Sequence, residues 1–225
     1  MRDVLRRFEY ILLIGGFLCL SYVGFSYGRA YIYQSYESYK LDQARLNRPA
    51  DFTGYLGSLF GKKQDQRAEQ TPSEAHVEPG PDTDVGLVGR IEIPRLELSA
   101  MVREGVDDAT LGEAVGHVPS TALPGMRGNV GIAAHRDTYF RPVRYIRKGD
   151  IIRMVTGKAT YEYAVESMKI VSPKQVDVLD PTPQPALTLI TCYPFNFVGH
   201  APKRYIVRAR QVRMEAKLSR AASGS

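Results

Sequence analysis

An uncharged apolar run near the N-terminus is the feature that most constrains how this chain can fold. The run is YILLIGGFLCLSYVGFSYG, residues Tyr10–Gly28, and it contains no charged side chain. It is long enough to cross the hydrocarbon core of a bilayer as one helix, and membrane helices tolerate glycine better than soluble helices do. We therefore expect an N-terminal membrane anchor over residues 1–35, with residues 10–28 in contact with lipid.

Two other interpretations of the run remain open. A cleaved signal peptide has a shorter apolar region followed by a small-residue cleavage site, and no good A-x-A site follows here. A buried helix of a soluble protein is the second alternative. Basic residues stand on both sides of the run, so the positive-inside rule indicates its orientation only weakly.

The sequence beyond the anchor divides into a polar segment and a strand-rich segment. Residues 61–84 contain almost no apolar side chain and are rich in Pro, Gly, Glu and Gln, a composition typical of flexible linkers. We expect a juxtamembrane segment and disordered linker over 36–84, a folded domain over 85–215, and a flexible tail over 216–225.

The folded domain has the pattern of an all-β protein. Short runs rich in β-branched and apolar residues are bounded by Gly and Pro, which is typical of strands; they cover 85–94, 96–102, 127–135, 148–156, 159–171, 185–192 and 204–212. Residues 108–119 are the best candidate for a short helix, with Asp107 or Asp108 as its N-cap. About eight short strands in one domain favour a barrel or a sandwich.

The chain has two cysteines, and only one lies in the folded domain. Cys19 is inside the apolar run, so Cys192 has no partner for a disulfide within an extracytoplasmic domain. A lone thiol outside the cytosol is exposed to oxidants. Cys192 is therefore either buried and inert, or retained because it reacts.

Period-2 alternation assigns faces to the last two predicted strands. In ALTLITC, Thr188, Ile190 and Cys192 share one face, and the other face carries Leu187, Leu189 and Thr191. In RYIVRARQ, Tyr205, Val207 and Ala209 share one face, and the other carries Arg204, Ile206, Arg208 and Arg210. With the apolar faces turned inward, Arg204 and Cys192 point away from the core and border a groove on the outside of a barrel.

His135 is the histidine that best suits a partner for the thiol. It ends the predicted strand VGIAAH, and a histidine beside a cysteine can pair with the thiolate and later protonate a leaving amine. His76 lies in the linker and is set aside, whereas His117 and His200 remain alternatives. Arg204 is the candidate for holding an oxyanion or the peptide, and Arg208 on the same predicted face is its rival.

Charge and composition exclude some partners. The formal net charge of +6 would suit nucleic acid, anionic lipid or an acidic wall polymer. The chain contains no recognisable nucleic-acid-binding motif, so we expect no nucleic-acid partner. The carboxylates form no ligand-spaced cluster with histidine, so we expect no metal and no cofactor.

Three stretches resemble the sortases, membrane-anchored cysteine transpeptidases of bacterial envelopes. TLITCYPFNFVGHAPKRYIVRA resembles the cysteine and arginine strands of class D members in particular, and IAAHRDTYFRPVRYIRKGDII resembles the histidine region. HVPSTALPGMRGN is similar to the Pro- and Gly-rich approach to that region. The resemblance covers roughly 85–213. It implies a closed sortase-type β-barrel of about eight strands with one or two short helices, preceded by a transmembrane helix.

The resemblance also implies the site and its chemistry. Cys192 would be the nucleophile, His135 the catalytic histidine and Arg204 the catalytic arginine. The substrate-binding residues would be Ala134, Thr188, Ile190 and Thr191, with Thr188 and Thr191 either supporting the strand or touching substrate. Many relatives have Gly where Ala134 stands, and the extra methyl group would narrow the groove.

The function implied is cleavage of an LPxTG-like sorting signal on exported proteins. The acyl group would rest on Cys192 as a thioester, and an amine of the cell wall or of another protein would then accept it. The chain would be a single-pass protein of the bacterial cytoplasmic membrane with its catalytic domain outside.

Other classes fit the sequence less well. The S-x-G-C setting of L,D-transpeptidases is absent, and papain-like proteases place cysteine before histidine. A membrane-tethered, non-catalytic β module for envelope assembly or adhesion is the main alternative, and such a module would keep Cys192 buried and inert.

Overall fold

A computed structural model describes residues 2–46, 55, 86–197 and 199–216 of the chain. In chain order its elements are α1 (Arg2–Arg45), β1 (Leu87–Ile93), η1 (Pro94–Leu96), β2 (Leu98–Glu104), α3 (Asp108–Glu113), β3 (Val115–His117), β4 (Asn129–Ala133), η2 (Arg141–Tyr145), β5 (Ile151–Val155), β6 (Ala159–Val171), η3 (Val176–Leu179), β7 (Ala186–Tyr193) and β8 (Lys203–Ala216).

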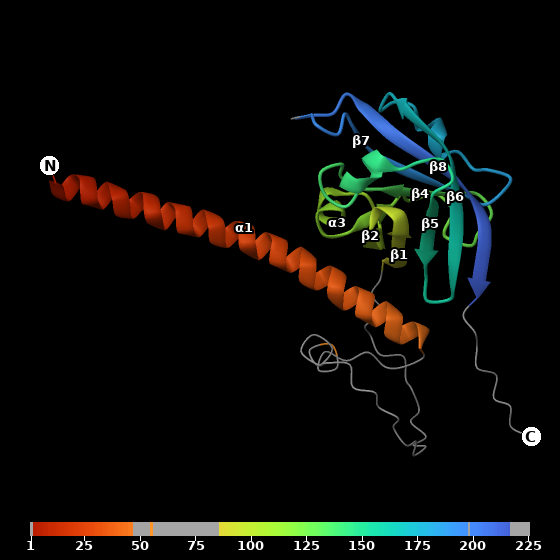
Figure 1. Ribbon diagram of the computed structural model, residues 1–225, viewed down its shortest axis with the longest axis horizontal. Helices are drawn as coiled ribbons and strands as arrows, with labels where there is room; N and C mark the ends of the chain where they lie inside the picture. The colour runs from red at the N-terminus through yellow and green to blue at the C-terminus, as the bar shows by residue number, and fades with distance from the viewer. Residues whose placement is uncertain (1, 47–54, 56–85, 198, 217–225) are drawn as a thin grey trace, which may run out of the picture.

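The strands of the described residues close into one barrel, and α1 extends away from it (Figure 1). The strand order is β1-β2-β3-β4-β7-β8-β6-β5. The pairs β2–β3 and β4–β7 are parallel, and the other neighbouring strands are antiparallel. The expected closed all-β barrel, preceded by a long N-terminal helix and containing few other helices, is confirmed.

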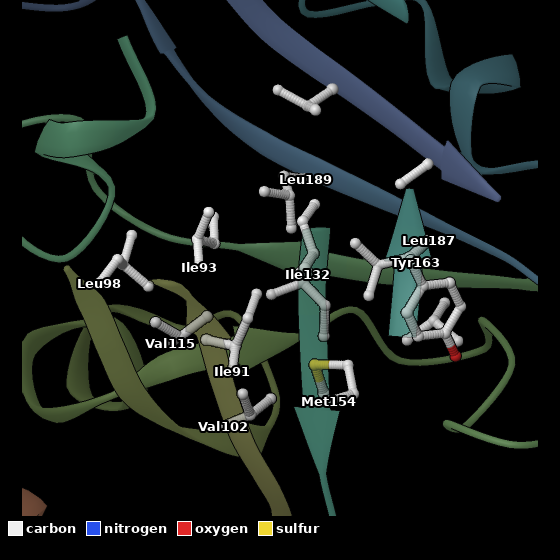
Figure 2. Packing of buried hydrophobic residues seen from close by; sticks show 14 of the residues in the cluster. Ile91, Ile93, Leu98, Val102, Val115, Ile132, Met154, Tyr163, Leu187 and Leu189 are labelled. Carbon is white, nitrogen blue, oxygen red and sulfur yellow. The ribbon is translucent and has the colours of Figure 1, made fainter. Parts of the chain in front are cut away.

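The hydrophobic core fills the inside of the barrel, and every second side chain of a strand points into it. Leu187 and Leu189 of β7 are 0% and 1% exposed, and they pack with Ile132, Tyr163 and other buried residues (Figure 2). Val207 and Ala209 of β8 belong to the same cluster. The predicted faces of β7 and β8 are therefore confirmed, because strand side chains alternate between inside and outside.

The outer face of β7 and β8 carries a second, smaller apolar cluster. Val171, Val178 and Ile206 are buried there, with Ile190 and Leu179 packed against them. Val178 and Leu179 belong to η3, so the connection between β6 and β7 covers part of the outer wall of the barrel.

The predicted short helix is present but ends earlier than its sequence range. Asp107 caps α3, and its carboxylate accepts a hydrogen bond from the Thr110 N–H at 3.0 Å. The helix stops at Glu113, and Val115–His117 forms β3, parallel to β2. Gly116 suits this close pairing because a Cβ there would lie 2.3 Å from the Gly105 carbonyl oxygen. Strand pairing thus overrides the helical pattern beyond Ala114.

The C-terminal part of α1 docks on the outside of the barrel. Leu41 packs with Met101, Val155 and Leu87 in an apolar cluster that is separate from the core. The Gln34 side chain bridges two elements: its amide oxygen accepts the Met101 N–H at 2.7 Å, and its amide nitrogen donates to the Glu113 carbonyl at 2.7 Å.

Charged contacts extend the same interface along α1. Arg90 of β1 donates to Ser38 Oγ at 2.7 Å and pairs with Asp42 at 3.1 Å. Arg45 donates to Thr160 Oγ1 at 2.9 Å, and Arg29 pairs with Glu113. The helix therefore runs on past residue 35 as part of the folded body, so its last turns are not an extended tether.

The domain boundaries stay predictions. The expected linker over 61–84 lies outside the described residues, and so does the tail from residue 217 onward. The barrel itself begins at Leu87 and its last strand ends at Ala216.

Candidate active site

Cys192 lies near the end of β7, on the wall of the barrel. It is a free thiol and is partly exposed. The inward Leu187 and Leu189 anchor the strand in the core, so alternation turns Cys192 to the outer face. Its Cα partner on the antiparallel neighbour β8 is Arg204, which is also partly exposed.

His135 reaches the same place from the other side of β7. Strand β4 runs parallel to β7 with Ala133 opposite Ile190. The pairing continues past the strand end, where the Ala134 N–H donates to the Ile190 carbonyl at 3.2 Å and Thr191 Oγ1 donates to the Ala134 carbonyl at 2.8 Å. His135 is the next residue after Ala134; it is partly exposed and follows the end of β4, on the side of β7 opposite to β8.

The strand order therefore brings the three expected catalytic side chains to one end of three adjacent strands. Cys192 lies on the middle strand β7, Arg204 is its partner on β8, and His135 lies in the segment that follows β4 on the other side. A thiol flanked by an imidazole and a guanidinium is suited to acyl transfer. The sulfur can attack a carbonyl, the imidazole can move the proton, and the guanidinium can hold the developing negative charge.

The alternative histidines are placed differently. The His117 ring is 2% exposed, and its Nδ1 lies 2.7 Å from Glu104 Oε2 while its Nε2 lies 3.0 Å from the Ala122 carbonyl. Both ring nitrogens are therefore already in contact with protein groups, Glu104 of β2 and Ala122 in the connection that follows β3. His200 is exposed in the connection between β7 and β8, and His76 lies outside the described residues.

The two candidate arginines also have different surroundings. Arg204 Nη1 donates to the Ala201 and Lys203 carbonyls at 3.2 and 3.1 Å, contacts that keep it near the turn beside Cys192. Arg208 pairs across the sheet with Thr188, and its Nη1 donates to Thr188 Oγ1 at 2.7 Å. The geometry therefore favours Arg204 as the arginine of the site.

The expected substrate-binding residues differ in what they offer to a ligand. Thr188 is 0% exposed and donates to Asn129 Oδ1 at 2.7 Å, and Thr191 is 3% exposed with its hydroxyl on Ala134. Of the two alternatives for these threonines, the contacts correspond to support of the strand. Ala134 is 5% exposed, whereas Ile190 is partly exposed at the edge of the outer apolar cluster.

Arg136 is a residue of the site that the sequence reasoning missed. Its side chain is almost buried and donates three hydrogen bonds into the β7–β8 connection: to the Pro194 carbonyl at 3.1 Å, the Phe197 carbonyl at 2.6 Å and the Gly199 carbonyl at 3.1 Å. The residue directly after His135 thus holds the loop that leads from Cys192 to Arg204. Its adjacency to His135 was the one available signal.

An aromatic cluster continues from the catalytic strands. The Tyr205 ring stacks on Tyr193 with centroids 6.3 Å apart and meets Phe195 edge-on at 5.4 Å. Burial, followed by the nearby Tyr193 hydroxyl, raises the pKa of Tyr205, so this phenol stays protonated near neutral pH. Among the described residues, no group of three or more His, Cys, Asp or Glu side chains could hold a metal ion.

Comparison with known proteins identifies the family. A family model described as the sortase domain matches residues 91–212. Sortase D of Bacillus subtilis is 34% identical over 125 residues, which span 55% of this chain and 63% of that protein. Sortase A of Listeria monocytogenes is 30% identical over 167 residues, which span 71% of this chain and 70% of that protein.

Solved structures agree with the sequence comparison. A sortase D5 transpeptidase of Clostridium perfringens superposes with a TM-score of 0.52 at 28% identity, covering 57% of this chain and 79% of that chain. Listeria monocytogenes sortase A gives a TM-score of 0.53 at 28% identity, covering 58% and 90%. Taken with the family match over most of the barrel, these similarities show that the chain belongs to the sortase family of cysteine transpeptidases.

Proposed function

We propose that this chain cleaves an LPxTG-like sorting signal near the C-terminus of exported proteins and transfers the product to an amine in the cell envelope. The observation that supports the proposal is the strand order β4-β7-β8, in which Arg204 of β8 is the Cα partner of Cys192 and His135 follows the end of β4 on the other side of β7. The family membership of the barrel supports the same reaction class.

In the first half of the reaction, the Cys192 sulfur attacks the carbonyl carbon of the scissile amide. Arg204 donates hydrogen bonds to the oxygen that becomes negative, or to the peptide next to it. The amide C–N bond breaks, and His135 gives its proton to the departing amine. The acyl group then rests on Cys192 as a thioester.

In the second half, an acceptor amine attacks the thioester carbonyl and the C–S bond breaks. His135, neutral after the first half, takes the proton from the attacking amine, and the sulfur leaves as the thiolate. The pair is thereby restored for another turnover. Water in place of the amine would give hydrolysis by the same steps.

The outer apolar cluster supports a place for the sorting peptide. Ile190 and Ile206 lie on the outer face of β7 and β8, and η3 forms a wall beside them. A peptide lying there would approach Cys192 along β7. Ala134, Thr188 and Thr191 would shape this groove mainly by holding its backbone in place.

We further propose that α1 anchors the chain in the bacterial cytoplasmic membrane as a single span, with the barrel outside. Among the described residues one helix, Leu12–Arg45, is long and apolar enough to cross a bilayer. The exported substrate and the envelope acceptor of the proposed reaction would both be found on that side.

The test is capture of the thioester. The detergent-solubilised chain is mixed with a sorting-signal peptide, and the intact protein mass is measured with and without an added amine. We expect an adduct of the acyl fragment on Cys192, released by amine as a new peptide bond, and neither in Cys192→Ala. Turnover by Cys192→Ala, or a thiol that forms no adduct with any such peptide or with an alkylating reagent, would favour the non-catalytic β module instead.

A further inference from the structure

A pocket rich in arginine lies next to the connection between β7 and β8. It has a volume of about 620 Å³, and its charged lining residues are Arg95, Glu97, Arg141, Arg144 and Arg147. They come from η1 and the residue after it, and from η2 and the residues around it. We refer to this pocket as the arginine pocket.

Among the described residues, three of the four arginines of the arginine pocket form no ion pair, although the Asp150 carboxylate also attracts Arg147. Arg95 is the exception, because its guanidinium forms a forked pair with Asp150 at 2.5 and 2.6 Å. In the part of the chain that the structure describes, no ion pair includes Arg141, Arg144 or Arg147. Glu97 is the only acidic side chain of the described lining, so the pocket keeps an excess of positive charge.

Contacts connect the arginine pocket to the residues around Cys192. Arg144 Nη1 donates to Asn196 Oδ1 at 3.2 Å, and its guanidinium lies 5.5 Å from the centre of the Phe195 ring. Phe195 packs on Tyr205, next to Arg204. From the other side, η2 follows the turn in which the Phe140 N–H donates to the His135 carbonyl at 3.2 Å. The pocket thus adjoins both loops that carry the site.

The arginine pocket and the outer apolar cluster are separate surfaces. The cluster is formed by β6, η3, β7 and β8, and the pocket shares no residue with it. A transpeptidase needs two such surfaces, because the acyl half of the first substrate still occupies its groove when the second substrate arrives. The first surface is apolar and suits the sorting peptide, so the charged one is available for the acceptor.

We propose that the arginine pocket binds an oxyanion, carboxylate or phosphate, carried by the amine acceptor that resolves the thioester on Cys192. This inference rests on the proposed function. Guanidinium groups offer planar, forked donors that match both oxyanions, and such charge-assisted bonds are stronger than neutral ones. The acceptor nitrogen attacks the thioester carbonyl, the C–S bond breaks, and the nitrogen's proton passes to His135, while the oxyanion stays bound and unchanged.

The binding half of the inference is tested without catalysis. Inorganic phosphate and acetate are titrated into the full chain in detergent, and their dissociation constants are measured by calorimetry for the wild type and for Arg141→Gln with Arg147→Gln. We expect at least one of the two anions to bind the wild type and to bind the double variant about tenfold or more weakly. Lys158→Gln, a control that removes one positive charge from the exposed β5–β6 turn, should bind as the wild type does.

The acceptor half is tested with paired amines. Triglycine is compared with triglycinamide, and phosphoethanolamine with ethanolamine, as acceptors for the thioester. We expect the charged member of at least one pair to have the lower KM, and the ratio of the two KM values to fall toward one in the double variant. A lower KM for triglycine than for triglycinamide would indicate an acceptor with a peptide carboxylate. A lower KM for phosphoethanolamine than for ethanolamine would indicate an acceptor that carries a phosphate.

The outcomes separate this inference from the proposed function. Thioester formation with equal KM values for charged and neutral amines would overturn the acceptor site and leave the transpeptidase intact. No thioester with any sorting peptide would refute the proposed function and the acceptor role with it. Equal anion affinity in the wild type and the double variant, or no anion binding at all, would show that the pocket holds no oxyanion.

Discussion

Arg204 and Arg208 lie on the same face of β8, but they meet different partners. Arg204 stands opposite Cys192, and its hydrogen bonds go to backbone carbonyls of the adjacent turn. Arg208 stands opposite Thr188 in a polar network beneath the β6–β7 connection, where it also donates to the Val178 carbonyl at 3.4 Å. Arg204 therefore lies next to the thiol, whereas the contacts of Arg208 hold the sheet and the β6–β7 connection together.

We therefore expect Arg204→Lys to lose activity and Arg208→Lys to keep it. Lysine retains the charge but not the planar, forked donor set, and loss of one preorganised donor to an oxyanion costs about 10²-fold or more in kcat. Arg208→Lys should cleave a sorting peptide at nearly the wild-type rate. The test is to measure the steady-state rate of peptide cleavage for both variants. If Arg208→Lys were the impaired variant and Arg204→Lys were nearly normal, the catalytic role would belong to Arg208.

The network around Thr188 allows a prediction about stability. Its hydroxyl donates to Asn129 Oδ1 and accepts from Arg208, each at 2.7 Å, in a position with no exposed surface. Thr188→Val keeps the shape but removes one hydrogen bond from each partner and leaves Asn129 Oδ1 without its donor, so the free energy of unfolding should fall by about 1–3 kcal/mol. Urea denaturation measures this change. Thr138→Val, at an exposed position, is the control and should be nearly neutral; equal effects at both sites would contradict the interpretation.

At the scale of the elements, the Asp150 carboxylate holds together three parts of the chain: η1, the end of η2 and the start of β5. Asp150 accepts the forked pair from Arg95 and also the Arg147 N–H at 2.7 Å. Arg95 in turn donates to the Tyr145 carbonyl at 2.6 Å. The side-chain hydrogen bond from Arg95 is the main cause that holds the pKa of Asp150 below its usual range.

This lowered pKa gives a pH dependence with a definite sign. The folded protein binds fewer protons at Asp150 than the unfolded chain does, so the interaction stabilises the fold above the ordinary aspartate pKa of about 3.9. This stabilisation decreases once the pH falls below the ordinary aspartate pKa. It is lost when the pH has also passed the lower pKa that Asp150 has in the folded protein. Asp150→Asn should be less stable at neutral pH and should lose less stability on acidification. Urea midpoints measured from neutral pH down to the acid limb test this, and an unchanged slope would refute it.

The elements also show which features local sequence could predict. The faces of β7 and β8 were predictable because side chains alternate with period 2, and the cap of α3 because Asp107 precedes a helical run. Strand β3 was missed because it is only Val115–His117 and directly follows the helix. Its partner β2 lies just before α3 in the chain, and the parallel pairing across this short helix leaves no pattern within Val115–His117 itself.

Hydrogen bonds from side chains to the backbone were harder to predict, for a physical reason. Arg136 binds three backbone carbonyls, and Gln34 binds a backbone N–H and a carbonyl. Such partners exist at almost every residue, so sequence gives no sign of which ones will be used. The assignment of Cys192, His135 and Arg204 to one site stays a prediction, and it rests on the motifs around them because their spacing along the chain does not imply proximity.

For the molecule as a whole, α1 runs without a break from the apolar run to the segment that docks on the barrel (Figure 1). From Arg29 to Arg45 the helix rises about 24 Å at 1.5 Å per residue, and contacts to the barrel occur along this length, from Arg29 and Gln34 to Asp42 and Arg45. If the apolar part spans the bilayer as proposed, the barrel is held at one height and in one orientation above it.

A fixed height predicts that a membrane-tethered substrate must present its sorting signal at a matching distance. In proteoliposomes, cleavage by the wild type should peak at one length of the spacer between the signal and its own membrane segment. A flexible insertion of six residues, three Gly-Ser pairs, between Gly28 and Arg29 leaves every contact of the docked segment in place. It uncouples this segment from the membrane-spanning part of α1. This variant should cleave over a broader range of spacer lengths, while a soluble sorting peptide should be cleaved equally by both chains. A wild type that is indifferent to spacer length would mean that the barrel moves freely on its anchor, and that the docked helix does not set the position of Cys192 above the membrane.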